Sequence, residues 1–184
     1  MIAVARVFSR FDRPWFLAGG WAIDLFLQRM SRDHEDIDVA VLRRDQSPIQ
    51  SYFADWNLVK LVQGRQESWR AGERLEPPIH EVHALRTEPA AHLELLFEET
   101  TGEDWTYRRD PRITRPLSEI AMTAEPGIPF LVPEIVLLYK AKKTAPKDEA
   151  DFDLASSRLG PRRRKWLKYA LETVHPDHPW IRRL

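Results

Sequence analysis

The chain of 184 residues contains no cysteine, which excludes disulfide bonds, thiolate metal sites and cysteine nucleophiles. It also lacks an apolar run long enough to cross a membrane. Arg6 and Arg10 interrupt the apolar N-terminal residues before the core of a signal peptide can form. We therefore expect a cytoplasmic protein with no membrane partner.

The sequence has no excess of charge of either sign, since 28 Lys and Arg residues balance 28 Asp and Glu residues. This balance argues against nucleic acid as a partner, because such a protein needs a basic surface. It leaves room for a small charged ligand in a local pocket. With 43% hydrophobic residues, the chain is long enough for one sizeable domain with a small appendage.

The spacing of apolar residues predicts an α+β fold. Near the N-terminus we expect an amphipathic helix with Val4, Val7, Phe8 and Phe11 on one side. A strand, a helix, a strand and a helix are then expected at 15–18, 21–30, 36–42 and 46–56. Short alternating segments predict strands at 58–63, 67–70, 79–85, 91–98 and 105–107.

The pattern changes after about residue 115. Residues 128–133, which read IPFLVP, predict a stiff connection. Helices are expected at 134–143, 147–159 and 162–174, and acidic residues open the second of them, as a helix N-terminus favours. We therefore predict a mixed sheet flanked by helices in residues 1–118, followed by a small helical region in residues 119–184.

Two carboxylates occupy a segment that otherwise predicts a buried strand. Residues two apart on a strand point to the same face, so Asp36 and Asp38 would lie about 6.5–7 Å apart. Unpaired, they would repel each other and resist desolvation. A divalent cation such as Mg²⁺ between them is one solution, and an exposed edge strand is the simpler alternative.

The glycine pair before them occurs where a strand is followed by the start of a helix. Such a helix start presents free backbone N–H groups, which favour phosphate, and Gly19 and Gly20 would let a phosphate approach the backbone closely. A tight strand-to-helix turn also explains the pair. Glycines, helix and paired acids in this order form a more specific combination than any of them alone.

A third carboxylate follows the same alternation in the segment 91–98. Leu93, Leu95 and Phe97 share one face of the expected strand, and Glu94 lies on the other. If this strand neighbours the one that carries the two aspartates, three carboxylates converge. Such a set is what two-metal phosphoryl or nucleotidyl transfer requires.

The ordered set of Gly19-Gly20, Asp36-Ile37-Asp38 and Glu94 resembles the nucleotidyltransferase superfamily typified by DNA polymerase beta. The longer stretches AGGWAID at 18–24 and HEDIDVAV at 34–41 are similar to the aminoglycoside and lincosamide nucleotidyltransferases. The strong likeness covers residues 15–45, and a looser one extends to YKAKK at 139–143. Two positions depart from the superfamily: Trp21 stands where serine is common, and the third acid is a glutamate.

The resemblance implies the nucleotidyltransferase fold and an enzyme that uses a nucleoside triphosphate, usually ATP, with Mg²⁺. Asp36 and Asp38 would hold the metal ions. Glu94 would complete the carboxylate set as a ligand, or act as general base for the acceptor. A hydroxyl of a small-molecule acceptor would attack the α-phosphorus, and pyrophosphate would leave.

The resemblance also implies phosphate contacts by Gly19, Gly20 and the backbone of Trp21. In the family a lysine of the C-terminal helices can reach the triphosphate, and Lys140 is the best candidate here, although a solvated helix face also explains it. His34 has the strand parity of the two aspartates, so it is either a phosphate contact or an ordinary hydrogen-bond partner.

Further polar residues keep two interpretations each. Asp24, one turn into the first expected helix after the glycines, has either a functional role or a structural hydrogen bond. Glu81 and His83 form either an acceptor-binding pair or a solvated sheet face. Acidic residues at 98–99 and 103–104 either contribute to an acceptor pocket or line a solvated loop.

The acceptor stays open between an aminoglycoside, a lincosamide and a physiological substrate unrelated to antibiotics. Related enzymes can complete the acceptor pocket from a second subunit, so a homodimer is a further expectation. The alternative function is a non-catalytic or toxin–antitoxin-type regulatory protein on the same fold. The presence of all three acids favours catalysis.

Overall fold

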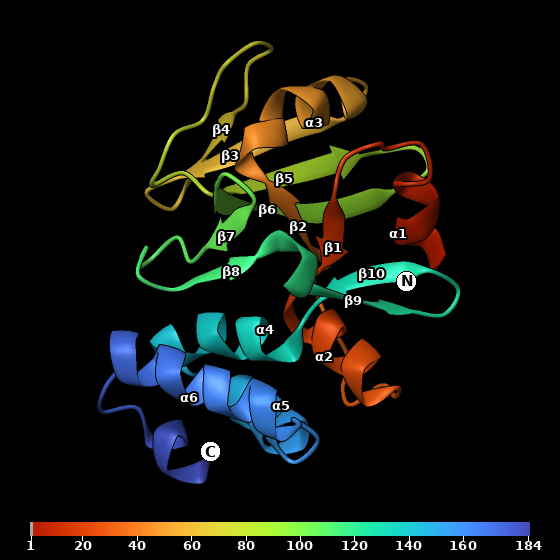
Figure 1. The fold of residues 1–184 in the computed structure, drawn as a ribbon. Helices are drawn as coiled ribbons and strands as arrows, with labels where there is room; N and C mark the ends of the chain where they lie inside the picture. The colour runs from red at the N-terminus through yellow and green to blue at the C-terminus, as the bar shows by residue number, and fades with distance from the viewer. Residues whose placement is uncertain (1) are drawn as a thin grey trace.

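The computed structural model describes residues 2–184, and the chain forms the α+β fold with a mixed sheet that the sequence predicts (Figure 1). The helices are α1 Ile2–Val7, α2 Gly19–Leu27, α3 Gln46–Tyr52, α4 Pro133–Lys140, α5 Pro146–Ser156 and α6 Pro161–Val174. The strands are β1 Trp15–Leu17, β2 Asp38–Leu42, β3 Asn57–Val62, β4 Arg65–Ser68, β5 Glu81–Arg86, β6 Ala91–Thr101, β7 Asp104–Thr106, β8 Thr114–Pro116, β9 Ala121–Ala124 and β10 Ile128–Leu131.

The sheet has ten strands, eight of them in the order β4-β3-β5-β6-β2-β1-β10-β9. β7 and β8 extend it beside the C-terminal half of β6. Two neighbouring pairs are parallel, β2 with β6 and β1 with β10, and the other pairs are antiparallel. β2 lies in the interior of the sheet, and its residues from Val39 to Leu42 are fully buried, as a parallel central strand requires.

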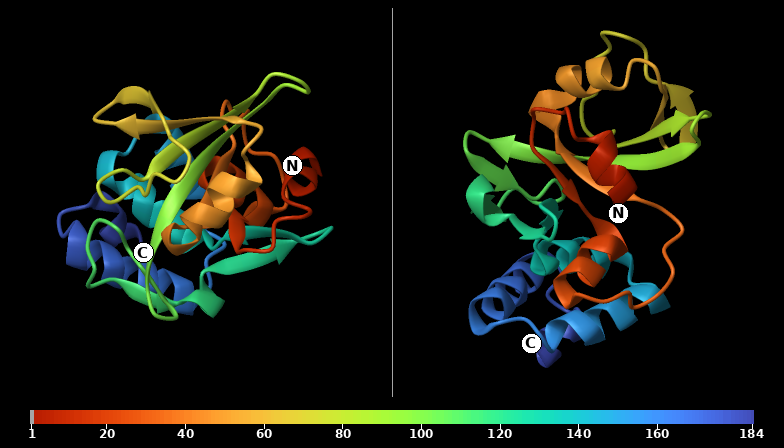
Figure 2. Two further views of the ribbon diagram at one scale, coloured as in Figure 1. Left: turned by 90° about the horizontal axis from the view of Figure 1, so that it is seen from above. Right: turned by 90° about the vertical axis from the view of Figure 1, so that its right-hand side faces the viewer.

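Helices gather at two ends of the molecule (Figure 2). α3 lies at one end, while α4, α5 and α6 lie together at the other, where α2 contacts α4 and α5. The predicted N-terminal helix is present, with Val4 buried within it and Phe8 buried just after its end. Phe8 stacks on Trp15 with ring centroids 4.6 Å apart and meets Phe53 edge-on, so aromatic contacts join α1, β1 and the end of α3.

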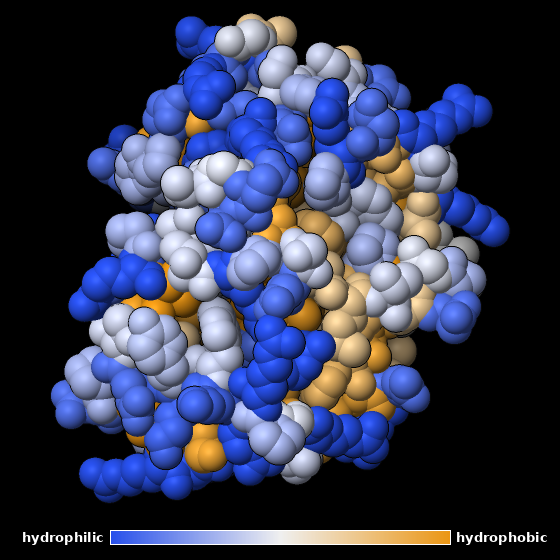
Figure 3. All heavy atoms as spheres, viewed as in Figure 1, coloured by the Kyte–Doolittle hydropathy of each residue, from blue (hydrophilic) through white to orange (hydrophobic). Residues whose placement is uncertain are grey.

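Apolar surface gathers over α2 and the β9–β10 hairpin on the face seen in Figure 3. Phe26 and Met30 of the α2 region and Met122 and Phe130 of the hairpin line a cavity of about 690 Å³ there. None of the helices described in residues 2–184 has the length and apolar composition that crossing a bilayer requires.

Several predicted boundaries are wrong. The strand expected at 36–42 begins at Asp38, and α2 begins at Gly19 rather than at Trp21. Residues expected to be a stiff connection form β10, because pairing with β1 at Phe130 and with β9 outweighs the unfavourable Pro129. β8 and β9 were not predicted.

The predicted domain division between residues 118 and 119 stays a prediction. β9 and β10 lie on the C-terminal side of that boundary, yet both belong to the main sheet. The purely helical part begins only at α4, with Pro133.

One buried carboxylate ties this helical part to the sheet. Glu134 of α4 has an exposed side-chain fraction of 0%, and it accepts hydrogen bonds from Arg115 of β8 at 2.8 Å and Arg163 of α6 at 2.9 Å. Because a buried carboxylate is tolerated only when it is paired, these two arginines make Glu134 an anchor for α4.

Replacing Glu134 with alanine is expected to lower the free energy of unfolding by about 3–5 kcal/mol, because both arginines lose their buried partner. The control Glu172→Ala, at an exposed position of α6, should change it by less than about 0.5 kcal/mol. Urea denaturation of both variants measures the difference. Equal stability of the two variants would contradict the anchoring role.

Candidate active site

The parallel pairing of β2 with β6 places Asp38 directly opposite Glu94. The backbone N–H of Glu94 donates to the carbonyl of Ile37 at 2.9 Å, which continues this pairing just before β2 begins. Leu93, Leu95 and Phe97 are buried on the other face of β6, as the alternation predicts. The two carboxylates therefore share one face of adjacent strands.

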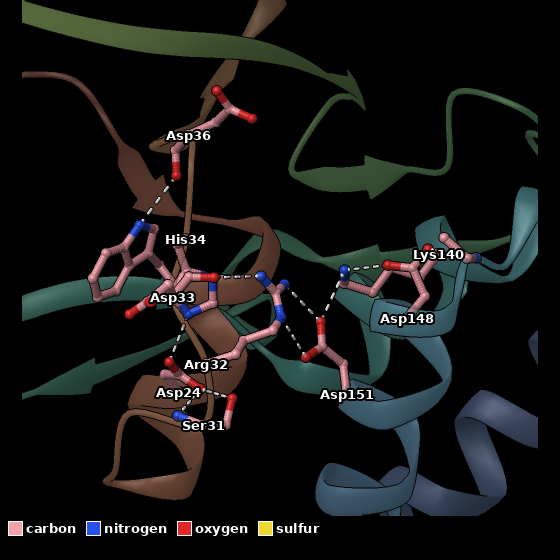
Figure 4. Close-up of polar contacts among 11 residues, drawn as sticks. Asp24, Ser31, Arg32, Asp33, His34, Asp36, Lys140, Asp148 and Asp151 are labelled. Carbon is pink, nitrogen blue, oxygen red and sulfur yellow. Dashed lines mark hydrogen bonds and ion pairs between the residues drawn. The ribbon is translucent and has the colours of Figure 1, made fainter.

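Asp36 does not lie on the strand, contrary to the prediction. It is exposed in the segment that precedes β2, where the indole Nε1 of Trp21 donates to its backbone carbonyl at 3.1 Å (Figure 4). Its carboxylate still acts on the other two, since its negative charge raises the pKa of both Asp38 and Glu94. The three acids thus form one electrostatic group, although only two of them occupy the sheet.

Crowding of these acids changes how they hold protons. Burial, followed by the charges of Asp38 and Asp36, raises the pKa of Glu94 to about 7. Burial also raises the pKa of Asp38, and the ammonium of Lys140 opposes that rise. A cation among these oxygens would remove the cost of ionising them, so the donor set fits Mg²⁺, which prefers carboxylate ligands.

Gly19 lies against Asp38 at the start of α2. Its φ is +56°, and a Cβ at this position would overlap the carboxylate of Asp38. The position therefore requires glycine both for its backbone conformation and for the close approach. Gly20 is explained by packing, because a Cβ there would overlap Arg32 and His34. The phosphate contacts expected of Gly19, Gly20 and Trp21 stay predictions.

His34 and Asp24 form a buried pair beneath the start of α2. The Nε2 of His34 lies 2.6 Å from a carboxylate oxygen of Asp24, and both side chains are 3% exposed (Figure 4). Asp24 also accepts from the backbone N–H and the hydroxyl of Ser31. Of the two interpretations that the sequence leaves open for each residue, this geometry supports the structural hydrogen bond. A phosphate contact by His34 stays a prediction.

Lys140 takes part in a charged network that the sequence does not reveal (Figure 4). Its ammonium lies 2.6 Å from Asp148 and 3.0 Å from Asp151, both of α5. The carboxylate of Asp151 also forms an ion pair with the guanidinium of Arg32, with 3.2 Å between Oδ2 and Nη2. In the sequence, the acidic residues of α5 are explained by their position at a helix N-terminus, and no spacing signal links them to Arg32, more than a hundred positions earlier.

A cavity of about 330 Å³ lies where Asp38 and Glu94, α4 and the loop after β7 meet, and Asp36 is not part of its lining. Its lining combines the sheet carboxylates with several cations: Ala18, Gly19, Asp38, His80, Glu81, Glu94, Leu96, Glu98, Arg108, Arg109, Leu131, Val136, Tyr139 and Lys140. The larger cavity beside α2 and β10 contains none of the three acids. The smaller cavity is therefore the candidate active site.

Sequence reasoning missed most of the far wall of this cavity. Glu98, for which the sequence left open an acceptor pocket or a solvated loop, lines the cavity as a buried residue of β6 and accepts from the hydroxyl of Tyr139 at 2.6 Å. The guanidinium of Arg108 lies 5.2 Å from the centre of the Tyr139 ring, and burial lowers the pKa of Arg108. Arg109 donates to the carbonyl of Tyr139 at 2.8 Å. No motif marks these residues, because only the fold brings them to the acids.

Comparison with known proteins agrees with this geometry. Residues 1–76 match the model of a family described as aminoglycoside-2''-adenylyltransferase, while no protein with a curated description matches significantly. The lincosamide antibiotic adenylyltransferase LnuA, solved with lincomycin bound, is 16% identical with a TM-score of 0.58, covering 86% of this chain and 95% of that one. ANT(2'')-Ia, in complex with adenylyl-2''-tobramycin, is 17% identical with a TM-score of 0.61, covering 92% and 93%.

The chain therefore has the fold of the nucleotidyltransferases. Within that class, the predicted resemblance to the aminoglycoside and lincosamide enzymes is confirmed. The family match over residues 1–76 supports the likeness to the aminoglycoside enzymes, and the two structural matches support the likeness to both groups. These findings support a nucleotidyltransferase enzyme.

The raised pKa of Glu94 predicts a pH dependence of stability in metal-free solution. In the unfolded chain this carboxyl titrates near its usual 4.5, whereas in the folded protein it keeps its proton to about pH 7. The folded state binds more protons between these values, so Glu94 makes stability fall as the pH rises through that window. Glu94→Gln is expected to exceed the wild type by at least about 1 kcal/mol at about pH 8 and to lose that advantage near pH 4.

Urea denaturation of both proteins across this pH range in the presence of a chelator measures the effect. Glu172→Gln, at the exposed position of α6, serves as the control that should follow the wild type at every pH. A gap between Glu94→Gln and the wild type that stays constant with pH would contradict the raised pKa.

Proposed function

We propose that this protein transfers a nucleotidyl group to a hydroxyl of a small molecule and releases pyrophosphate, with AMP from ATP as the first candidate for the transferred group. The observation that carries the proposal is the pairing of Asp38 with Glu94 on adjacent strands, beside a glycine at a helix start and within one cavity. A carboxylate pair, a close backbone approach and a cavity are what metal-assisted attack on a phosphate requires.

Asp36, Asp38 and Glu94 would hold Mg²⁺, which when bound neutralises charge on the triphosphate and lowers the cost of attack at the α-phosphorus. Gly19 leaves room for the carboxylate of Asp38, which a side chain at this position would displace. Lys140 brings a positive charge to the same cavity, and pairing with Asp148 and Asp151 holds its side chain in place. We propose that it neutralises phosphate charge.

In the reaction, a bond forms between the acceptor oxygen and the α-phosphorus while the bond from that phosphorus to the leaving pyrophosphate breaks. The acceptor proton needs a base. Glu94, with a pKa of about 7, can accept a proton near neutral pH when it is not held as a metal ligand. A base poised near the working pH is the efficient choice for such a transfer.

For the acceptor, the printed names of the matched structures suggest two classes to test first, the lincosamides and the aminoglycosides. The cavity wall includes Glu81 and Glu98 but also Arg108 and Arg109, so it is not uniformly acidic. A polycationic aminoglycoside would meet these arginines. Hydroxylated metabolites unrelated to antibiotics therefore belong in the same panel. A cytoplasmic location and a homodimer remain parts of the proposal.

The alternative of a non-catalytic or toxin–antitoxin-type regulatory protein has less support. It does not require Asp38 and Glu94 to lie opposite each other beside an open cavity. Of the two matched proteins named above, LnuA is described as an adenylyltransferase, and a second structure of ANT(2'')-Ia describes that protein as an antibiotic-resistance factor.

Transfer should be detected by incubating the protein with Mg²⁺, each of the four common nucleoside triphosphates and the acceptor panel, following pyrophosphate release and product mass. Asp38→Asn is expected to reduce kcat/KM by about 1,000-fold or more, because it removes a charged metal ligand. Its thermal unfolding should stay cooperative, since the change also relieves repulsion among the acids.

The matched control is Asp33→Asn, at an exposed aspartate of the loop before β2, which should retain wild-type activity. Wild-type activity in Asp38→Asn would exclude the proposed role of that residue. Absence of Mg²⁺-dependent binding of any nucleoside triphosphate to the wild type would overturn the function as a whole.

A further inference from the structure

Two histidines lie beside Glu94 on the side away from the aspartates. His83 of β5 is directly opposite Glu94 of β6, and His92 precedes Glu94 by two residues on the same strand, so all three side chains share one face. One ligand atom from each lies within 4.8 Å of the others. His92 is exposed, so the group is open to solvent.

The distance between the two imidazoles fits a shared ion. The Nδ1 of His83 and the Nε2 of His92 are 3.2 Å apart. Two nitrogens bound to one tetrahedral Zn²⁺ at its usual bond length lie about 3.3–3.4 Å apart. The rings would therefore need little movement to bind the same ion.

A second observation concerns the other nitrogen of His83. Its Nε2 lies 3.0 Å from a carboxylate oxygen of Glu81 and 3.8 Å from one of Glu94, and the tautomer with the proton on this nitrogen donates it to Glu81. The lone pair of Nδ1 then faces His92. Metal-binding histidines are commonly fixed in this way, by a carboxylate on the nitrogen that does not bind the ion.

The ligand types separate this group from the carboxylates of the proposed magnesium site. Imidazole nitrogens suit Zn²⁺, Co²⁺ and Ni²⁺, whereas Mg²⁺ prefers oxygen. We propose that His83, His92 and Glu94 bind a transition-metal ion of the Zn²⁺ class, with Glu81 holding His83 in position and water completing the coordination.

A consequence follows for nucleotidyl transfer, and this part rests on the proposed function. Glu94 belongs to both groups, being opposite Asp38 on one side and opposite His83 on the other. A Zn²⁺ ion held by the histidines draws Glu94 away from Asp38, so micromolar Zn²⁺ inhibits transfer in the presence of Mg²⁺.

Binding is tested on the whole protein without nucleotide, by titrating Co²⁺ and recording its visible absorption, and by calorimetric titration with Zn²⁺. The wild type should give the intense bands of four-coordinate Co²⁺ at one ion per chain. His92→Gln should weaken Zn²⁺ binding by about tenfold or more, and Glu81→Ala, which removes the orienting carboxylate, by about 10–100-fold.

Two controls locate the ion. Asp36→Asn leaves the histidine group intact and should keep the cobalt spectrum, and so should His80→Gln, which removes a nearby histidine outside the group. Unchanged Zn²⁺ affinity in His92→Gln, or loss of the spectrum in Asp36→Asn, would overturn the site. Because these measurements need no activity, a protein that transfers no nucleotide can still bind the ion, and the two proposals fail separately.

Discussion

The parallel register of β2 against β6 is the constraint on which the site depends. It sets Asp38 opposite Glu94, and the antiparallel pairing of β5 then sets His83 opposite the same glutamate. A slip of one residue would turn Asp38 toward the core and Val39 toward the cavity, at the cost of burying a carboxylate and exposing an apolar side chain. Burial of Val39, Val41 and their neighbours thus fixes the geometry of the acids.

The acids are tolerated because residues far apart in the sequence bring a positive charge close to them. Lys140, on α4, lowers the pKa of Asp38 against the effect of burial. Its own charge is balanced by Asp148 and Asp151 of α5, and Asp151 is shared with Arg32 from the loop before β2. The position of α4 therefore matters to the electrostatics of the sheet. Because Glu134 anchors this helix, a buried ion pair outside the cavity lining supports the charge balance within the cavity.

Alternation along the chain was enough to predict the fold class and to put Asp38 and Glu94 on one face, since a strand with one buried face allows little choice. It failed where tertiary contacts decide. Asp36 left the strand although its parity fits, and β10 formed in spite of Pro129. The partners of Lys140 and the position of Arg108 in the cavity depend on segments far apart in sequence. Local patterns carry no information about such contacts.

Glu94 is the point at which the two proposed groups of ligands compete. Its carboxylate can bind a metal ion together with the oxygen ligands of the aspartates, beside the cavity of about 330 Å³, or together with the nitrogen ligands of the two histidines. The glutamate has one methylene more than the aspartate that is commoner at this position of the superfamily, and this length gives it reach toward either side. A shorter aspartate at the same register would extend less far from the strand toward both groups. The departure from the common motif and the neighbouring histidine pair therefore have one physical interpretation, a ligand that can be shared.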